Sequence, residues 1–542
     1  MVESDLAKAL IKRLSELRGA RTTIEGVWKQ CGDYSFPMRS QGFYGEEGSP
    51  DGAQTKQAEL YDTTTTDSGK ILASSIQTGT TPANARWFGL AVQDADDYEK
   101  KWLDDSAQRL WTAIHGGNFD AESMDGLLDL VAFGLFVFFV TEARDERGAV
   151  DGFRFELWPL SQCYCASSTE SGLIDTVFRP YSLTVGQCVT QFGLDAVSPK
   201  VRDQYHDDKL DEKVKILHAV YPRPEGSTGS LRANRMPFAS VYVEMDSRVV
   251  LKNSGFHEQP VMVPRWTRVP NSVYATGPMF EALPDAKALN KITQMELVGI
   301  DTAVSGMWIA EDDGVLNPRT VRVGPRKIIV ANSVDSMKPL STGTDFSVSF
   351  TKRADLSAQI RKIMMADQLP PMEGQPRTAT EFYARLNMIR QLLGPVYGRM
   401  QVEFLQPLIH RCFGIALRAG LFAAPPDSLR DRTYTVVYLS PMAKSQKMEE
   451  VSAIDGGFAR IANLAQLTGD PSVWDNVKRD DGVRAVLDGL GVPAALVNGE
   501  DEVAAIREQR AQQEQAAQQQ AMGQALTMEA ASAGINRMAQ AQ

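Results

Sequence analysis

The sequence has none of the short motifs that mark common enzyme families. The zinc-protease pattern HExxH, the hydrolase pattern GxSxG and the dinucleotide-binding pattern GxGxxG are all absent. The run TTTTDSGK resembles a phosphate-binding loop, but it lacks the first glycine of that loop, and Ile71 stands where a serine or threonine would bind magnesium. We therefore expect a protein that is not an enzyme and that holds no cofactor.

Residues that bind metals or form disulfides are few. The five histidines lie far apart, and the five cysteines are odd in number and scattered, which argues against a disulfide framework. Cys163 and Cys165 are the only close pair, and no second pair completes a metal site, so we interpret them as small buried residues. Acidic runs at 94–97, 311–313 and 480–481 usually face solvent, with a nuclease-like two-metal site as the alternative. We expect no metal.

Long hydrophobic runs are also missing. The most apolar stretch, residues 127–140, is about 14 residues long and contains Asp129, whereas a helix needs about 20 apolar residues to span a bilayer. We predict a buried helix running into a strand there. The N-terminal residues MVESDLAKALIKRL lack the charged-then-apolar pattern of a signal peptide. We expect no contact with a membrane and folding in a reducing cytoplasm.

Positive charge is in deficit, with 57 Lys and Arg against 68 Asp and Glu, a net charge of −11. Such a chain is a poor candidate for gripping many phosphates, but it could let nucleic acid slide past without sticking. Residues 316–353 depart from this balance, with seven positive and two negative side chains and a net charge of +5. This basic patch suits contact with DNA or an acidic partner, or docking on an acidic neighbouring subunit. Its candidate contact residues are Arg319, Arg322, Arg326, Lys327 and Lys338.

The 542 residues, 43% of them hydrophobic, are enough for several domains. Apolar residues at helical spacing in the first part predict helices over residues 3–28, 61–78, 98–114 and 119–135. From residue 136 to about 180 the period becomes two, which predicts strands. A helix at 184–192 and further strands are expected at 214–222, 241–244, 249–252 and 261–267. The fold class is thus α+β and mainly α-helical.

Two expected helices, 277–304 and 353–368, bracket a strand-rich insert that runs from 307 to 350. A loop rich in proline and glycine follows at 369–377 (LPPMEGQPR). Next comes a long helix that begins at the capping box of Thr378 and Glu381. Pro395 predicts a kink near Leu392, and Pro407 predicts a second bend or an end. A loop feeding a long kinked helix suggests a mechanical element.

The C-terminal part begins with an expected strand at 434–439. Helices are expected at 443–467 and 473–490 and from residue 502 onward. The tail from residue 509 is rich in glutamine and alanine and has almost no apolar stripe. It could form a barrel with copies of itself or remain disordered.

Several short motifs, taken in order, resemble those of the head-to-tail connecting, or portal, proteins of short-tailed phages (podoviruses). They are Tyr61-Asp62 with the Thr-rich helix after it, Thr81-Pro82 leading to Arg86-Trp87-Phe88, and YATGP at 274–278 leading to LPDAKALN at 283–290. The series continues with TATE at 378–381, LGPV at 393–396, QPLI at 406–409, LSPMA at 439–443 and LGVP at 490–493. The similarity runs along the whole chain and depends on order and spacing rather than on one motif.

The resemblance implies the portal fold, with parts called wing, stem, clip, tunnel loop and crown, assembled as a ring of usually twelve copies. It implies a wing at 1–276, stem helices at 277–306 and 353–368, a clip at 307–352, a long kinked wing helix at 378–424, and a crown with a helical tail at 425–542. The tunnel loop facing DNA would comprise Leu369, Pro370, Pro371, Met372, Glu373, Gly374, Gln375, Pro376 and Arg377.

The implied function is a channel at one capsid vertex, through which DNA is packaged and ejected and to which the tail attaches. The implied partners are double-stranded DNA, the major capsid protein, the terminase motor and tail adaptor proteins. The protein would be assembled in the host cytoplasm and located in the virion. One alternative is a capsid or internal-core scaffolding protein that does not conduct DNA, and another is the nuclease or terminase-like enzyme mentioned above.

Overall fold

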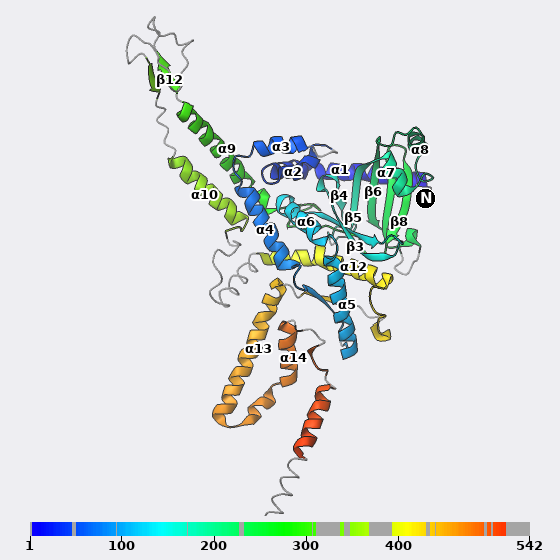
Figure 1. Cartoon of the computed structure of the whole chain (residues 1–542), viewed down its shortest axis with the longest axis vertical. Coiled ribbons are helices and arrows are strands. Elements are labelled where there is room, and N and C mark those ends of the chain that lie inside the picture. The colour runs from blue at the N-terminus through cyan, green and yellow to red at the C-terminus, as the bar shows by residue number, and fades with distance from the viewer. Residues whose placement is uncertain are drawn as a thin grey trace, which may run out of the picture. The chain divides into compact units, whose positions relative to one another are not determined.

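The structure is a computed structural model (Figure 1). Its chain divides into two compact units. It describes residues 3–45, 50–93, 95–170, 172–226, 232–305, 307–310, 337–340, 347–367, 393–429, 434–438, 441–490, 492, 496–499 and 502–515. Unit 1 comprises residues 1–87, 110–421 and 440–445, and unit 2 comprises residues 88–109, 422–439 and 446–542. Mixed helices and strands agree with the α+β class expected from the sequence.

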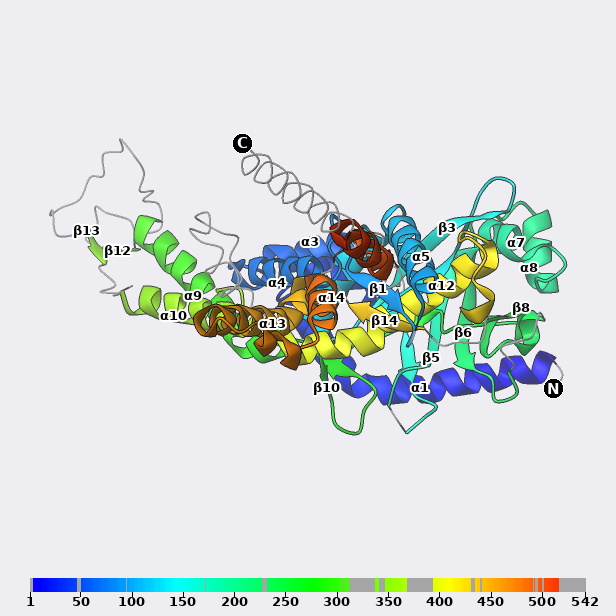
Figure 2. The same cartoon turned by 90° about the horizontal axis from the view of Figure 1, so that it is seen from below.

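Unit 1 begins with α1 (Glu3–Asp33), which lies along one face of a five-stranded sheet (Figure 2). Its leucines at helical spacing, Leu10, Leu14 and Leu17, are buried against Leu217 and Val241 of that sheet. The predicted helix is confirmed and ends five residues later than expected. The other helices of this part are α2 (Pro37–Ser40), α3 (Pro50–Ala58), α4 (Thr64–Thr80), α6 (Phe119–Phe133), α7 (Val185–Phe192) and α8 (Pro199–His206), while α5 (Asp97–His115) crosses from unit 2 into unit 1 at Leu110.

The five-stranded sheet is antiparallel in the order β4-β5-β6-β7-β8. Its strands are β4 (Tyr164–Ala166), β5 (Thr176–Thr184), β6 (Lys213–Pro222), β7 (Phe238–Glu244) and β8 (Val249–Phe256). On β6 the alternation of side chains sends Leu217 and Ala219 toward α1, and Val214 and Ile216 toward α7 and α8. Strand β6 confirms the strand expected at 214–222, and β4 and β5 confirm the change to two-residue periodicity predicted between residue 136 and about residue 180.

The apolar stretch 127–140 is a helix followed by a strand, as predicted. Helix α6 ends at Phe133, and Gly134 adopts a left-handed conformation with φ +87°. A Cβ atom on Gly134 would lie 2.1 Å from the carbonyl carbon of Thr276, so only glycine fits. Strand β2 (Val137–Arg144) then lies between β3 (Val150–Trp158) and β9 (Val261–Met262) in a three-stranded sheet.

The single strand predicted at 261–267 is wrong. Strand β9 stops at Met262, and the separate strand β10 (Thr267–Arg268) pairs with β11 (Ala275–Thr276). Pro264 stands between them and has no N–H to continue the ladder of hydrogen bonds. The break leaves Arg265 in a bridge opposite Leu135, with its side chain inside the protein.

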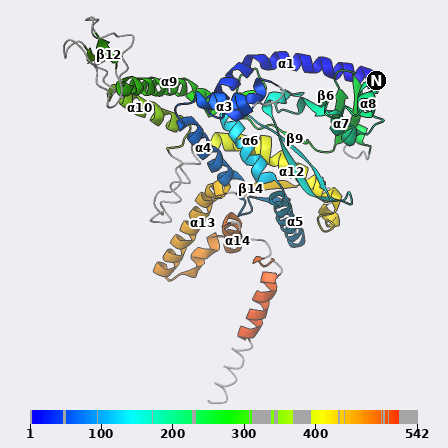
Figure 3. The same cartoon turned by 45° about the horizontal axis from the view of Figure 1, so that its top comes forward.

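A helical hairpin extends from the rest of unit 1 (Figures 1 and 3). It consists of α9 (Pro278–Ser305) and α10 (Ser347–Ile363), with the strand pair β12 (Met307–Ala310) and β13 (Met337–Leu340) at its far end. The start expected for the second helix, residue 353, is wrong by six residues. Val348 and Phe350 alternate with polar residues as in a strand. In the structure, however, Ser349 and Arg353 both contact the carboxylate of Glu296 on α9, which requires residues four apart to lie on one face of a helix.

The last part of unit 1 is the helix that follows residue 392. Residues 393–400 are helical, residues Gln401–Leu405 form a π-helical turn, and α12 (Gln406–Ala419) continues to Gly420. The helix therefore does not end at Pro407. The expected capping box at Thr378 and kink near Leu392 lie outside the described residues.

Unit 2 contains a two-stranded sheet and a set of helices. Strand β1 (Phe88–Ala91) pairs with β14 (Thr435–Tyr438) as an antiparallel ladder. Helix α13 (Pro441–Thr468) packs against α14 (Arg479–Leu490), where Gly482 and Gly489 allow close approach to Phe458 and Val451.

The continuous helix predicted at 473–490 is wrong, because a 3₁₀ turn at Pro471–Asn476 precedes α14. Residues 502–515 are helical, and the tail beyond them is outside the described residues. Among the helices described, none is both long and apolar enough to cross a membrane.

Candidate functional site: the hairpin and the long helix

The two helices of the hairpin are joined by a buried carboxylate. The side chain of Glu296 on α9 is only 4% exposed, and it accepts hydrogen bonds from Ser349 Oγ and from Arg353 Nη1, the latter at 3.1 Å. A buried charge is costly unless it is paired and hydrogen-bonded, so sliding one helix along the other would be strongly unfavourable. This contact fixes the height of α10 against α9.

The base of the hairpin is held by the chain that enters α4. Asn290 accepts a hydrogen bond from the backbone N–H of Tyr61 at 2.6 Å and donates to the carbonyl of Glu59 at 2.9 Å. Ser357 on α10 forms a hydrogen bond with Thr64 at 3.4 Å. Since both helices are tied to the same short segment, Asn290 and Ser357 lie at about the same height along the hairpin.

The basic patch predicted at the far end of the hairpin falls mostly outside the described residues. Arg319, Arg322, Arg326 and Lys327 are not described. Lys338 lies on β13 opposite Ile309 of β12, and its side chain is exposed. The predicted tunnel loop, residues 369–377, also lies outside the described part, so neither prediction is tested.

The π-helical turn in the long helix is explained by Pro407. A proline cannot donate the hydrogen bond to the carbonyl four residues earlier, which belongs to Glu403. A π turn changes the pairing locally, and the helix continues afterward. The bend predicted from Pro407 thus corresponds to a real irregularity placed one turn before the proline.

The π turn carries the residue that fastens the long helix to the strands. Glu403 receives Arg265 Nη2 at 2.5 Å and Arg265 Nε at 3.1 Å, a two-point contact between side chains that are 8% and 0% exposed. Arg265 also donates to the carbonyl of Val273 at 3.2 Å. Next to it, Arg399 donates to the carbonyl of Trp266, and Phe404 packs edge-on against Phe136 and Phe138.

A second ionic contact lies farther along α12. Glu258 accepts hydrogen bonds from Arg411 at 2.9 Å and from Arg418 at 2.5 Å. Burial alone would raise the pKa of Glu258, but the hydrogen bond from Arg418 and the charge of Arg411 outweigh burial and lower it. Arg411 itself is almost fully buried and lies 4.8 Å from the ring centre of Phe256. The long helix is therefore attached by charge at two points.

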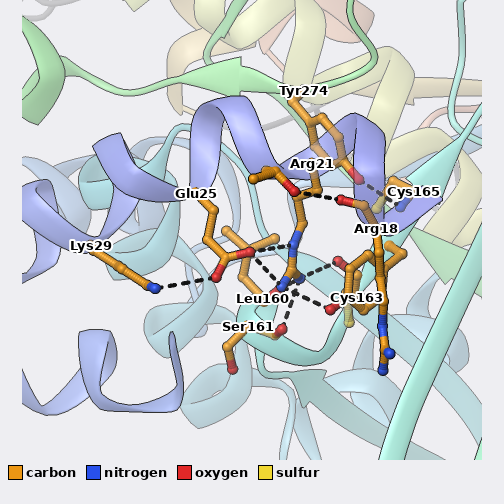
Figure 4. Close-up of polar contacts among 11 residues, drawn as sticks. Arg18, Arg21, Glu25, Lys29, Leu160, Ser161, Cys163, Cys165 and Tyr274 are labelled. Atoms are coloured by element: carbon orange, nitrogen blue, oxygen red, sulfur yellow. Dashed lines mark hydrogen bonds and ion pairs between the residues drawn. The ribbon is translucent and has the colours of Figure 1, made fainter. Parts of the chain in front are cut away.

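Helix α1 is attached to the sheet by a buried arginine (Figure 4). Arg21 is 3% exposed and donates to the carbonyl oxygens of Leu160, Ser161 and Cys163, at 3.1, 2.8 and 2.9 Å. It also pairs with Glu25 at 3.0 Å and donates to the hydroxyl of Tyr164 at 3.1 Å. A cleft of about 540 Å³ lies beside it, but every donor direction of Arg21 is already used, so this arginine is structural.

His115, His218 and the five cysteines are placed as structural residues. His115 accepts a hydrogen bond from Trp87 at 3.0 Å and faces Asp120 at 2.9 Å, while His218 is buried against Tyr242. All five cysteines are buried, as interpreted for Cys163 and Cys165, and burial raises the pKa of the Cys163 thiol to about 12. Within the described part of the chain, no group of three His, Cys, Asp or Glu residues could hold a metal ion.

The ionic contacts and one surface of α9 were not predicted from the sequence. The partners Arg265 and Glu403 are 138 residues apart, and no local pattern links them. The surface is the side of α9 that carries Phe280 and Met295, which are 43% and 59% exposed. A second apolar stripe on α9, besides the buried one, was visible in the sequence and could have indicated it.

Comparison with known proteins gives consistent results. Residues 7–497 match the family model described as bacteriophage head to tail connecting protein. The chain is 29% identical to the portal protein of Salmonella phage epsilon15, over 95% of this chain and 93% of that protein. It is 26% identical to the probable portal protein of Bordetella phage BPP-1, again over 95% and 93%.

Solved structures resemble the chain only weakly. A chain from the virion of a native gene transfer agent particle matches with a TM-score of 0.34 and 12% identity, over 72% of this chain and 85% of that chain. The family assignment therefore depends on the sequence matches, which extend along nearly the whole chain. On these matches, the chain belongs to the family of bacteriophage head to tail connecting proteins.

Proposed function

We propose that the chain is the subunit of a phage portal, a ring that forms a channel at one vertex of the capsid in the virion. The observation that carries this proposal is the alignment of 95% of the chain with a relative named portal protein. The tail would attach to this ring, and DNA would pass through it during packaging and ejection. The scaffolding alternative is less well supported because both curated relatives are named as portal proteins.

The fold supports a division of labour among the parts of the subunit. The hairpin α9–α10 would be the stem, and the segment at its far end, with Lys338, would be the clip that meets the motor or the tail. The strand-rich part of unit 1 would be the wing, and the helices of unit 2 would include the crown. Residues 369–377 would form the tunnel loop that faces DNA.

The charge of the chain supports a channel rather than a DNA clamp. Twelve copies would carry a formal charge of about −132, since each chain carries −11. Acidic walls repel the phosphate backbone and keep DNA from binding while it moves. The ring would therefore need a separate motor, the terminase, to drive DNA inward, and it would itself contribute shape and charge but no catalysis.

Electron microscopy of the purified protein tests the proposal. Rings with a central hole wide enough for duplex DNA, about 20 Å, are expected, with class averages giving the number of copies. A control sample incubated with linear DNA and magnesium should leave the DNA intact. Persistently monomeric protein, or metal-dependent cleavage of the DNA, would contradict the portal assignment.

A further inference from the structure

Helix α9 has two apolar sides, of which the hairpin uses one. The buried side carries Leu289, Thr293 and Glu296 and faces α10 and the body of unit 1. The opposite side carries a stripe of apolar residues at spacings of four, four and seven along one line, interrupted in the last step by exposed Lys291. The residues of this stripe, all exposed, are Phe280, Pro284, Ala288 and Met295.

Helix α10 has an outward side of a different character. Leu356 and Ile360 are buried toward α9. On the opposite side, spacings of three and four align small exposed side chains, below Val348, which is 71% exposed. These small residues are Thr351, Ala354 and Ala358, and the exposed carboxylate of Asp355 lies beside them on the same face. A row of small side chains forms a shallow groove into which the larger side chains of another helix can pack.

The two outward sides point in opposite directions, because each lies on the side of its helix that faces away from the other helix. The large apolar stripe of α9 cannot reach the small groove of α10 within one chain. It can reach the groove of a second copy placed beside it. A contact between two different surfaces of identical chains is head-to-tail. Repeating it closes a ring when the rotations between copies add up to a full turn with no translation.

Heights along the hairpin match for such a contact. Glu296 meets Ser349 and Arg353, and Asn290 and Ser357 are tied to the same segment. The two helices run in opposite directions, so two residues at the same height have numbers that add up to a constant, here about 647. Ala288 and Ala358 therefore lie at nearly the same height. Rotation about an axis parallel to the hairpin keeps these heights equal in neighbouring copies.

The charges at the base of the hairpin are complementary at these heights. Glu281 and Asp285 flank the stripe on α9, and Arg361 and Lys362 flank the groove on α10. Within the described part of the chain, none of these four side chains forms a hydrogen bond or an ion pair with another residue. Asp285 and Lys362 lie at the same height. The acidic residues of α9 in one copy would therefore face the basic residues of α10 in the next copy.

We propose that adjacent copies of this chain pack with the α9 stripe of one against the α10 groove of the next, at equal height, with Glu281 and Asp285 facing Arg361 and Lys362. This inference rests on the proposed function, since it assumes a ring, but it goes further by naming the two mating surfaces and their register. The occupant of each exposed side is thus a second copy of the same chain.

Disulfide crosslinking of the full-length protein tests the register. The double variant Ala288→Cys/Ala358→Cys should give a ladder of covalent oligomers under mild oxidation. Each single variant should stay uncrosslinked, because the proposed contact brings α9 of one copy to α10 of the next and never brings two copies of the same helix together. The control Ala288→Cys/Thr351→Cys places the thiols about 12 Å apart in height, beyond the Cα separation of about 7 Å that a disulfide tolerates. The native cysteines are all buried and should not react.

The outcomes separate this inference from the proposed function. If wild-type rings form but the matched pair gives no ladder, the interface is wrong and the portal assignment is unaffected. Covalent ladders from a single variant would also overturn the proposed interface. So would a ladder from the control pair as strong as that from the matched pair. If no rings form under any condition, both proposals fail.

A charge reversal checks the same contact without cysteines. Glu281→Lys/Asp285→Lys should abolish rings while leaving a folded monomer by circular dichroism, because like charges would then face each other. Adding Arg361→Glu/Lys362→Glu should restore rings. Failure of the fourfold variant to assemble, with its monomer folded, would count against the proposed charge pairing.

Discussion

Replacing Glu403 by leucine should destabilise unit 1 by about 3–5 kcal/mol, the usual cost of removing one partner of a buried ion pair. The side chain of Arg265 is 0% exposed, and among the described residues the change leaves its guanidinium with only the carbonyl of Val273 as an acceptor. The double variant Arg265→Met/Glu403→Leu removes both charges and should cost far less than the single change. The expected signature is therefore a large coupling energy between the two positions.

Urea unfolding followed by tryptophan fluorescence measures these differences. The two units need not unfold together, so both transitions are fitted, and only one should shift. Protein is kept dilute enough to remain monomeric, since ring assembly adds stability of its own. Glu16→Gln is the matched control, because its partner Arg13 forms a pair that is 52% exposed on both sides and worth about 1 kcal/mol or less. The single variant Arg265→Met is measured as well. The reasoning would be refuted if Glu403→Leu lowered the free energy of unfolding no more than the control does. It would also be refuted if the loss in the double variant equalled the sum of the losses in the two single variants.

Three further predictions concern function and pH. Deleting residues 370–375 should leave rings intact in micrographs but reduce DNA packaging or retention in particles; normal packaging and retention would rule out the tunnel-loop assignment. Reversing the charges of the basic patch should weaken binding of the motor or tail in a pull-down assay, and unchanged binding would remove the case for a partner site; the changes are Arg319→Glu, Arg322→Glu and Arg326→Glu. Burial, with the nearby charges of Arg179 and Lys252, lowers the pKa of His218 from 6.5 to about 3. The unfolded chain binds this proton more tightly, so stability should fall as pH drops below about 6.5, by about 2 kcal/mol at pH 5. His218→Gln should flatten this dependence in urea titrations at pH 7 and pH 5, whereas the exposed control His206→Gln should not; equal slopes for both variants would contradict it.

The parts of the fold that the sequence predicted well are those set by local periodicity. Leucines at helical spacing placed α1, and the apolar run around Asp129 correctly indicated a helix followed by a strand. Local patterns failed where a distant contact decides the structure. The strand-like alternation of Val348 and Phe350 is overridden by Glu296, about 50 residues earlier, which two residues on one face of α10 reach together.

The candidate site was predictable only in part for the same reason. The order of motifs indicated a connector with a hairpin and a long helix, and Pro407 indicated an irregular turn. The motifs could not indicate that this turn presents Glu403 to Arg265, which is 138 residues away. That pairing depends on the break in the strand at Pro264, next to Arg265. Ionic partners are chosen by three-dimensional proximity, for which a single sequence carries no periodic signal.

Three glutamates that pair with arginines share one mechanical role in unit 1; the side chains of Glu296 and Glu403 are buried, and that of Glu258 is 22% exposed. Glu296 joins the two hairpin helices, while Glu403 and Glu258 fasten the long helix, and each meets at least one arginine. Apolar packing alone tolerates small shifts along a helix, whereas a buried carboxylate must keep its partner or bear the full cost of desolvation. Subunits of a ring must present identical heights to their neighbours, since a shift in one hairpin would misalign both contacts it makes. Placing ion pairs at the joints therefore suits a chain that must repeat one geometry around a closed ring.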